Sequence, residues 1–530
     1  MFARAVLRAD IARPPQANKA SRMFHEAPAA VPPPGHPMSP YPAVWRRHFA
    51  GLDPNRSVPA TIWCDRGSES PLAISTRIPL CPSPQEKRLA GLHVAALLNN
   101  ALCIHGAASA SIVSPRQDAA AWLCDAVLRL LMLPREPFST MPLDFLHELV
   151  RQVFRQDFRL DADPAREALL REKQLAAPAT RAGQPAPPRP GLALAVNIGL
   201  YLTSLALVRV EADGRFVVEG LSRRKSAPEN KVPSLADLLA TIQEEAKALA
   251  AAAGAALDAV GIGIAATVVR GRILPVPGYG LFTEDVSNTP ETVAALLQGF
   301  SRDVARGRPL AVVNDGQAQA VFAYRHGGAT PSPPARLAGD MVSVRLGACP
   351  AVHRLDSCGR SAAGFHEYGW CVTRYHAANA TRGCFTTIHP YLSYAGVAIV
   401  AQELGLLRKC RIPHDAASSF FRDALEADDP GLRQNAAHVY GILGAHLAML
   451  VDALHRDRPL AAIRLLGSRA NRLDPVAFTA MANGFAAFAS RHDLGLRDVE
   501  LTLLQETSVI AGLVGAAHAV LDAAPQPEGR

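Results

Sequence analysis

The segment Asn314-Asp315-Gly316 has residue types that could do chemistry. It directly follows the apolar run Leu310–Val313, which predicts a buried strand. A carboxylate at the end of a buried strand, at the mouth of a cleft, is suited to act as a general base. Asn-Asp before Gly is also typical of a turn and of a helix N-cap, so a purely structural role is the alternative. Asp315 is therefore the candidate catalytic residue.

A second group of residues could bind a metal ion. Cysteine thiolates and histidine imidazoles are the usual ligands of zinc. Two cysteines and two histidines fall within 19 residues, but their spacing matches no zinc motif, so scattered core cysteines and surface histidines are the alternative. The group consists of Cys371, His376, Cys384 and His389.

Strands and helices alternate in the part of the chain that carries these residues. Leu202–Val210 alternates like a half-buried strand, and Ser234 opens a long Ala/Leu-rich helix that ends at Gly254. A second series of strands and helices follows the first. We therefore expect two α/β lobes, residues 191–325 and 326–525, with a ligand-binding cleft between them and a terminal helix that returns to the first lobe.

The first third of the chain has a different character. Residues 1–60 are rich in Pro and Ala and predict a largely irregular arm, and residues 177–190 have the composition of a linker. Between them, residues 61–176 predict a mostly helical region whose role the sequence does not indicate. Apolar residues recur there at helical spacing over Lys87–Leu98, Ala119–Leu131 and Leu143–Phe154.

Composition restricts the compartment and the partners. The 530 residues include nine cysteines without a small-scaffold spacing, which favours a reducing compartment and hence a cytoplasmic protein. No apolar run reaches the ~18 residues that span a bilayer, and the N-terminus lacks a signal segment, so no membrane partner is expected. The net charge of +8 indicates a solvated Arg-rich surface, with contact to nucleic acid or acidic lipid as the alternative.

From residue 191 to 525 the sequence resembles the ROK family of sugar kinases and sugar-responsive repressors. Val312–Ala318 follows the family pattern Val-x-Asn-Asp-x-x-Ala, and Val260–Ala265 follows its Gly-Ile-Gly-Ile strand. Gly364–Trp370 retains the Glu and the following Gly of its Gly-Glu-x-Gly-His motif. The blocks come in the family's order, and the resemblance implies a two-lobed actin/hexokinase-like (ribonuclease H-like) α/β ATPase fold.

The resemblance also implies roles for individual residues. Asp315 would accept the proton of a sugar hydroxyl as that oxygen attacks the γ-phosphate of ATP, with Mg²⁺ bridging the β- and γ-phosphates. The implied sugar-binding residues are Asn314, Glu367 and His366. The implied nucleotide-binding residues are Asn197, Gly199, Gly347 and Gly467.

The phosphate-binding turns depart from the family pattern. Asn197 replaces an Asp that helps to hold magnesium, and it carries no charge. Ala348 and Cys349 replace a Thr-Gly pair, and Pro350 removes a backbone N–H. These changes put ordinary ATP use in question.

The zinc motif of the family is also altered. Trp370 stands where the family has a zinc-binding His, and Ala377 and Asn379 stand where it has two of its cysteines. Zinc is therefore not expected in the family's usual site. A rearranged site would use Cys371, His376 and Cys384.

Three functions remain open at this point. The first is ATP-dependent phosphorylation of a hexose or N-acetylhexosamine. The second is a catalytically impaired sugar-binding sensor (a pseudokinase) or a ROK-type transcriptional regulator. The third is an interaction protein whose N-terminal region works on an inert scaffold. A small-molecule sugar is the expected partner and the resemblance implies a homodimer, but nucleic acid is not expected because Ala119–Leu131 is too apolar to be a recognition helix.

Overall fold

The computed structural model describes most of the chain after residue 45, while most of the predicted arm and linker lie outside the described residues. The described residues are 46, 48–67, 71–132, 143–162, 189–199, 202–225, 234–276, 280–282, 288–327, 337–347, 350–361, 364–375, 385–466 and 473–523.

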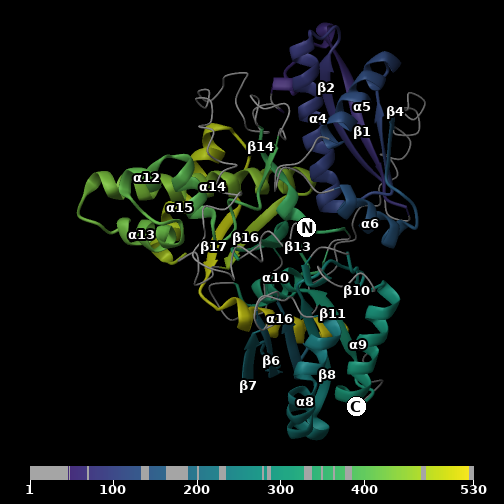
Figure 1. Ribbon diagram of the computed structural model, residues 1–530, viewed down its shortest axis with the longest axis vertical. Helices are drawn as coiled ribbons and strands as arrows, with labels where there is room; N and C mark the ends of the chain where they lie inside the picture. Colours follow the sequence, from purple (N-terminus) through teal and green to yellow (C-terminus); the bar gives the residue numbers. More distant parts are fainter. Residues whose placement is uncertain are drawn as a thin grey trace.

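The first lobe is built on a five-stranded mixed sheet with the order β11-β8-β5-β6-β7 (Figure 1). β5, β6 and β7 form an antiparallel meander, whereas β8 and β11 run parallel to β5. β5 is buried along almost its whole length, as expected for a central strand covered on both faces. The strands are β5 (Gly191–Ile198), β6 (Leu202–Val210), β7 (Phe216–Lys225), β8 (Leu257–Ile264) and β11 (Leu310–Asn314).

Two capped helices cover one face of this sheet. α8 (Leu235–Ala253) begins after Ser234, whose side chain accepts the N–H of Asp237. It ends at Gly254, whose φ of +57° is unfavourable for residues with a side chain. α9 (Pro290–Val304) packs beside α8 and shares its hydrophobic core. The predicted start and end of the first of these helices are confirmed.

The second lobe repeats the arrangement with four strands in the order β13-β12-β16-β17. In both sheets the first strand has its antiparallel hairpin partner on one side and strands parallel to it on the other. This repeated order confirms the predicted two-lobed, ribonuclease H-like fold. The strands are β12 (Asp340–Arg345), β13 (Ala351–Leu355), β16 (Leu460–Leu466) and β17 (Glu500–Leu504).

Further elements of the second lobe lie between β13 and β17. They are β14 (Val372–Tyr375), β15 (Phe385–Thr387), α11 (Gly396–Glu403), α12 (Leu406–Cys410), α13 (Ala417–Ala424), α14 (Pro430–Asp457) and α15 (Pro475–Arg491). By length and hydropathy, the stretch 430–456 of α14 could cross a membrane, and it is the only such helix among the described residues. It is also 67% buried inside the protein, as is typical of a core helix.

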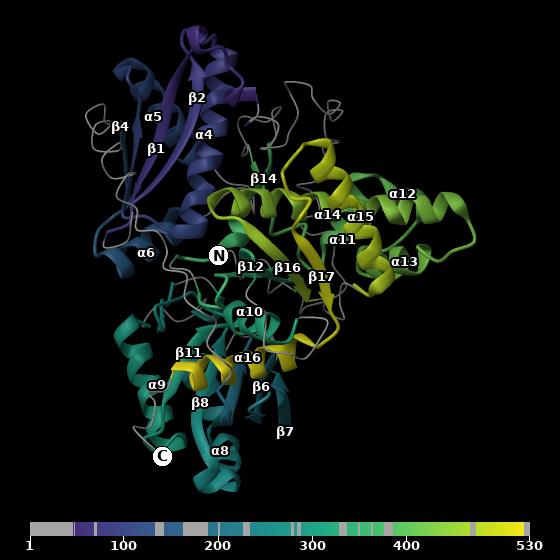
Figure 2. The same ribbon diagram turned by 180° about the vertical axis from the view of Figure 1, so that it is seen from behind.

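The last helix returns to the first lobe, as predicted. α16 (Ser508–Ala523) lies against β5, β8 and α10 (Asp315–His326), and Figure 2 shows it in yellow among these elements. A Cβ on Gly515 would stand 1.7 Å from the carbonyl oxygen of Ala318, so the two helix backbones touch. Only glycine permits this approach. The contact fixes α10, which begins at Asp315.

The N-terminal region lies at the top of Figure 1, and its buried side chains belong to the same hydrophobic core as those of the second lobe. The three predicted helices are confirmed as α4 (Pro84–His105), α5 (Gln117–Met132) and α6 (Leu143–Phe154). The region also contains a four-stranded sheet, order β2-β1-β3-β4, which the sequence did not predict. Its strands are β1 (Ser57–Asp65), β2 (Leu72–Pro79), β3 (Ser109–Val113) and β4 (Arg159–Ala162).

β1 begins inside the segment that was predicted to be an irregular arm. That prediction rested on the prolines of the segment, which favour irregular structure. Pro59 pairs with Arg77 of β2, but β3 pairs with β1 only from Thr61 onward. The missing N–H of Pro59 therefore costs no hydrogen bond to β3. The region is thus an α/β domain rather than a purely helical one.

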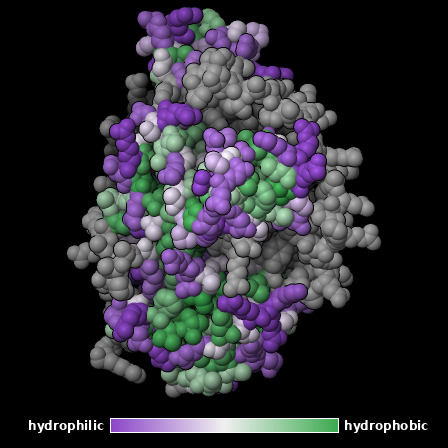
Figure 3. All heavy atoms as spheres, turned by 90° about the vertical axis from the view of Figure 1, so that its left-hand side faces the viewer, coloured by the Kyte–Doolittle hydropathy of each residue, from purple (hydrophilic) through white to green (hydrophobic). Residues whose placement is uncertain are grey.

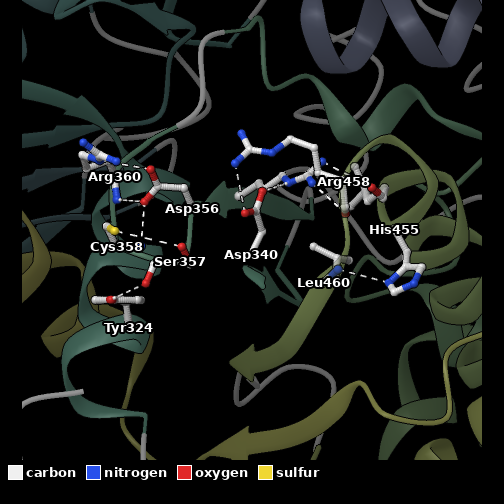
Figure 4. A network of polar contacts seen from close by, with 11 residues as sticks. Tyr324, Asp340, Asp356, Ser357, Cys358, Arg360, His455, Arg458 and Leu460 are labelled. Atoms are coloured by element: carbon white, nitrogen blue, oxygen red, sulfur yellow. Dashed lines mark hydrogen bonds and ion pairs between the residues drawn. The ribbon is translucent and has the colours of Figure 1, made fainter. Parts of the chain in front are cut away.

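A polar network anchors the end of β12 farthest from the candidate site (Figure 4). Asp340 accepts hydrogen bonds from Arg354 at 2.7 Å and from Arg458 at 3.2 Å, and Arg354 is 1% exposed. Nearby, the hydroxyl of Tyr324 on α10 donates to the carbonyl of Ser357 at 3.0 Å. Removing one partner of such a buried pair leaves an uncompensated charge, so the network holds β12 in place.

The free edge of the first-lobe sheet is partly apolar. Among the described strands β7 pairs with β6 alone, and its Val217 and Leu221 are 47% and 38% exposed. Figure 3 shows the side of the molecule on which β7 lies. Hydrophobic surface gathers in the lower part of this view, which the first lobe forms.

Candidate functional site

Asn314 and Asp315 join β11 to α10. The side-chain oxygen of Asn314 accepts the N–H groups of Gly316 at 2.8 Å and Gln317 at 3.3 Å, so Asn314 is the N-cap of the helix. Its Nδ2 donates to the carbonyl of Ala266 at 2.9 Å. Asn314 thus has the capping role that the sequence offered as an alternative, and its predicted sugar-binding role stays a prediction. The cap holds Asp315 in the first turn of α10, where the helix dipole favours a negative charge.

Asp315 forms an ion pair that was not predicted from the sequence. Its Oδ2 lies 2.9 Å from Nη2 of Arg345, the last residue of β12, and its Oδ1 accepts the N–H of Gly316. Asp315 is 5% exposed, and Nε of Arg345 is buried without a hydrogen-bond partner among the described residues. The signal in the sequence was a charged residue within the apolar run Met341–Leu346.

Glu367 is held by a residue of the first lobe. Thr267 donates its hydroxyl proton to Oε1 of Glu367 over 2.6 Å. Burial raises the pKa of Glu367 to about 7; the hydrogen bond from Thr267 opposes this rise, and the negative charge of Asp315 adds to it. Thr267 lies just before the short hairpin of β9 (Val268–Val269) and β10 (Arg272–Ile273), and nothing in its sequence context marked it.

His366 is turned toward aromatic neighbours. Its φ of +59° is uncommon for a residue other than glycine. Its Nδ1 shares a hydrogen bond with the hydroxyl of Tyr368 at 3.0 Å, and its ring packs on His353 with centroids 4.3 Å apart. The predicted sugar-binding role of His366 stays a prediction.

The predicted nucleotide-binding positions fit a magnesium-bound nucleotide poorly. Asn197 offers no carboxylate to Mg²⁺, and its buried side chain lies close to Gly512 of α16. The N–H of Gly199 donates to the carbonyl of Leu202 at 3.0 Å, closing the hairpin. The carbonyl of Gly347 accepts the N–H of Tyr394, and Gly467 lies outside the described residues.

The predicted metal ligands are only partly described. Cys371 is fully buried, and it lies close enough to Cys103 to raise the pKa of that thiol. His376 and Cys384 lie outside the described residues. Within the part of the chain that the structure describes, no group of three His, Cys, Asp or Glu side chains could hold a metal ion.

No protein-family model matches the sequence, and no curated protein is similar to it. Among solved structures, a putative sugar kinase from Cytophaga hutchinsonii is 16% identical, with a TM-score of 0.46 over 62% of this chain and all of that one. A ROK family glucokinase from Streptomyces griseus, solved with glucose and AMPPNP, is 19% identical, with a TM-score of 0.44 over 63% of this chain and all of that one.

A ROK family transcriptional regulator, described as a homolog of the E. coli MLC protein, is 14% identical. Its TM-score is 0.43 over 62% of this chain and 78% of that one. The solved structures similar to this chain thus include ROK sugar kinases and a ROK regulator, as the sequence blocks predicted. At these values the fold assignment itself rests on the strand order of the two sheets.

Proposed function

We propose that this protein binds a hexose or an N-acetylhexosamine between its two lobes and acts as a sensor rather than as a kinase. The observation that carries the proposal is the ion pair between Asp315 and Arg345. A general base must offer a lone pair to the proton that it removes. The guanidinium of Arg345 stabilises the negative charge of Asp315, which a general base loses when it takes up a proton, so the ion pair works against proton transfer.

The acceptors around Asp315 support a polyhydroxylated ligand. The charge of Asp315 acts on Glu367, and each carboxylate oxygen has two lone pairs. Sugar hydroxyl groups are donors that can pair with several such acceptors at once. A hydrogen bond to a charged group contributes about 1.5–3 kcal/mol, so two carboxylates could provide most of the affinity for a small sugar.

The residues at the predicted nucleotide-binding positions support the sensor role as well. Asn197 brings no charge to a metal ion, the N–H of Gly199 is already bonded, and Pro350 has no N–H to offer. Proteins that transfer phosphoryl groups depend on Mg²⁺ and on backbone donors around the phosphates. We therefore derive no catalytic step through ATP for this chain.

Phosphoryl transfer to the sugar, with Asp315 as general base, is the second candidate. It is favoured by the N-cap of Asn314, which holds Asp315 at the start of α10 beside the proposed sugar site. In that case Arg345 would have to leave Asp315 when substrate binds.

The free cysteines support the expected cytoplasmic location. Among the cysteines whose side chains the structure describes, none forms a disulfide, and Cys103 and Cys371 are neighbours. Unpaired neighbouring thiols are typical of a reducing compartment.

Calorimetric titration of the full-length protein with a panel of hexoses and N-acetylhexosamines tests the proposal. At least one sugar should bind, and Glu367→Gln should weaken that binding. If no sugar of the panel binds, the proposed function is wrong.

A further inference from the structure

Helix α4 of the N-terminal domain touches the segment that carries Glu367. A Cβ on Gly364 would lie 2.3 Å from the carbonyl oxygen of Ile104, and a Cβ on Gly106 would lie 2.7 Å from the ring of Phe365. Neither position has room for a side chain. The backbone at the end of α4 and the backbone before Glu367 are therefore in direct contact.

Backbone groups of this segment take their hydrogen bonds from α4. The N–H of Glu367 donates to the carbonyl of Cys103 at 2.8 Å. Asn99 Nδ2 donates to the carbonyl of Trp370 at 2.8 Å, and Asn100 Oδ1 accepts the N–H of Val372 at 2.7 Å. Buried backbone N–H and C=O groups need hydrogen-bond partners. Here α4 supplies these partners, as a neighbouring strand does within a sheet.

The contact is buried, and its Cys103 thiol is not activated for chemistry. Asn99 is 2% exposed, and Cys103 and Cys371 are fully buried. Burial raises the pKa of the Cys103 thiol, and the neighbouring Cys371 raises it further, so the sulfur of Cys103 stays protonated. The hydrogen bonds of the two asparagines, rather than sulfur chemistry, therefore define this contact.

We propose that α4 is a structural part of the ligand site, and that Asn99 and Asn100 are positioning residues for Glu367. The consequence for sugar affinity rests on the proposed function. Asn99 and Asn100 make their side-chain bonds at Trp370 and Val372, three and five residues beyond Glu367, and the carbonyl of Cys103 holds Glu367 itself. The contacts of α4 thus set the position of the backbone that carries Glu367.

The test compares two substitutions of Asn100 in the full-length protein. Asn100 Oδ1 accepts the N–H of Val372 at 2.7 Å, and its Nδ2 donates a longer bond to the carbonyl of Val372 at 3.5 Å. Asn100→Asp keeps the shorter bond, whereas Asn100→Leu has a similar size and can make neither. Asn99 donates to the carbonyl of Trp370, and an ionised Asp cannot donate. Asn99→Asp should therefore lose this bond and change the amide exchange as Asn100→Leu does. Amide hydrogen exchange of residues 364–373 is measured for each variant, with β8 (257–264) as the internal reference.

Asn100→Leu should speed exchange of the Val372 and Glu367 amides about tenfold, and should weaken sugar binding by a similar factor, since a lost buried hydrogen bond has this size. Asn100→Asp should match the wild type in both measurements. The proposal is overturned if Asn100→Leu leaves exchange unchanged, or if exchange speeds up while sugar affinity stays the same. If the wild type binds no sugar, the proposed function fails, and the exchange of the variants still decides whether α4 holds this segment.

Discussion

Nη2 of Arg345 lies 2.9 Å from Oδ2 of Asp315 and joins the end of β12 to the start of α10. β12 belongs to the second lobe, whereas α10 follows the last strand of the first-lobe sheet. The ion pair therefore links the two lobes at the residue that was predicted to be the catalytic base.

Replacing Arg345 should destabilise the protein, because the carboxylate of Asp315 would lose its ion-pair partner. Arg345→Thr leaves Asp315 buried without its cation and should lower the free energy of unfolding by about 1–3 kcal/mol, below the range for fully buried pairs because Arg345 is 22% exposed. Urea unfolding of both single variants and of Arg345→Thr with Asp315→Asn gives the coupling energy. A coupling near zero would show that the pair does not form in solution.

Asp315→Asn separates the ligand role of Asp315 from the catalytic one. As a sugar ligand, Asp315 loses one charged acceptor, and affinity should fall about tenfold or more. As a general base, it would leave affinity nearly intact while abolishing turnover. Calorimetry with the sugar that the wild type binds makes the comparison, and unchanged affinity would count against the sensor role.

The raised pKa of Glu367 gives a pH dependence with a defined sign. Burial favours the protonated carboxyl in the folded state, so its pKa is about 7 there and 4.5 as the reference value. The folded state then holds the proton more tightly, and stability should fall as pH rises from about 4.5 to about 7 and level off above it. Sugar hydroxyls donate to the ionised form, so affinity should rise over pH 6–8. Glu367→Gln should flatten both curves; a wild-type affinity that falls with rising pH would contradict this.

The backbone contact between α10 and α16 should tolerate no side chain. Gly515→Ala would place a Cβ 1.7 Å from the carbonyl oxygen of Ala318 and should cost about 1–3 kcal/mol or more of stability. Gly299→Ala in α9 is the matched control, because no atom lies within 4 Å of the position that its Cβ would take; it should stabilise by about 0.5–1 kcal/mol. Thermal unfolding of the two variants checks the difference, and equal effects would argue against the helix contact.

The fold of the two lobes could be predicted because local signals and the order of the blocks agreed. Leu202–Val210 is a strand with the predicted ends, and Ser234 and Gly254 limit α8 as expected. The sheet of the N-terminal domain was missed because β1 contains Pro59, which is compatible with a strand only where its nitrogen faces no neighbour.

The candidate site could be predicted only for residues within contiguous motifs. Asn314 and Asp315 follow a strand, so their place at its end was predictable. Arg345, Thr267 and Asn100 reach the site from other strands, lobes or domains. Such partners are set by tertiary contacts, which periodicity and propensity along the chain do not encode.

The most direct test of the central claim is a search for phosphorylated sugar. The wild-type protein is incubated with Mg-ATP and with each sugar that it binds, and the product is measured by mass spectrometry beside a sample without protein. We predict sugar binding with no sugar phosphate above that background, because the ion pair with Arg345 works against uptake of a proton by Asp315 and Asn197 offers no carboxylate to Mg²⁺. Steady formation of sugar phosphate that Asp315→Asn abolishes would contradict the account and identify the protein as a sugar kinase.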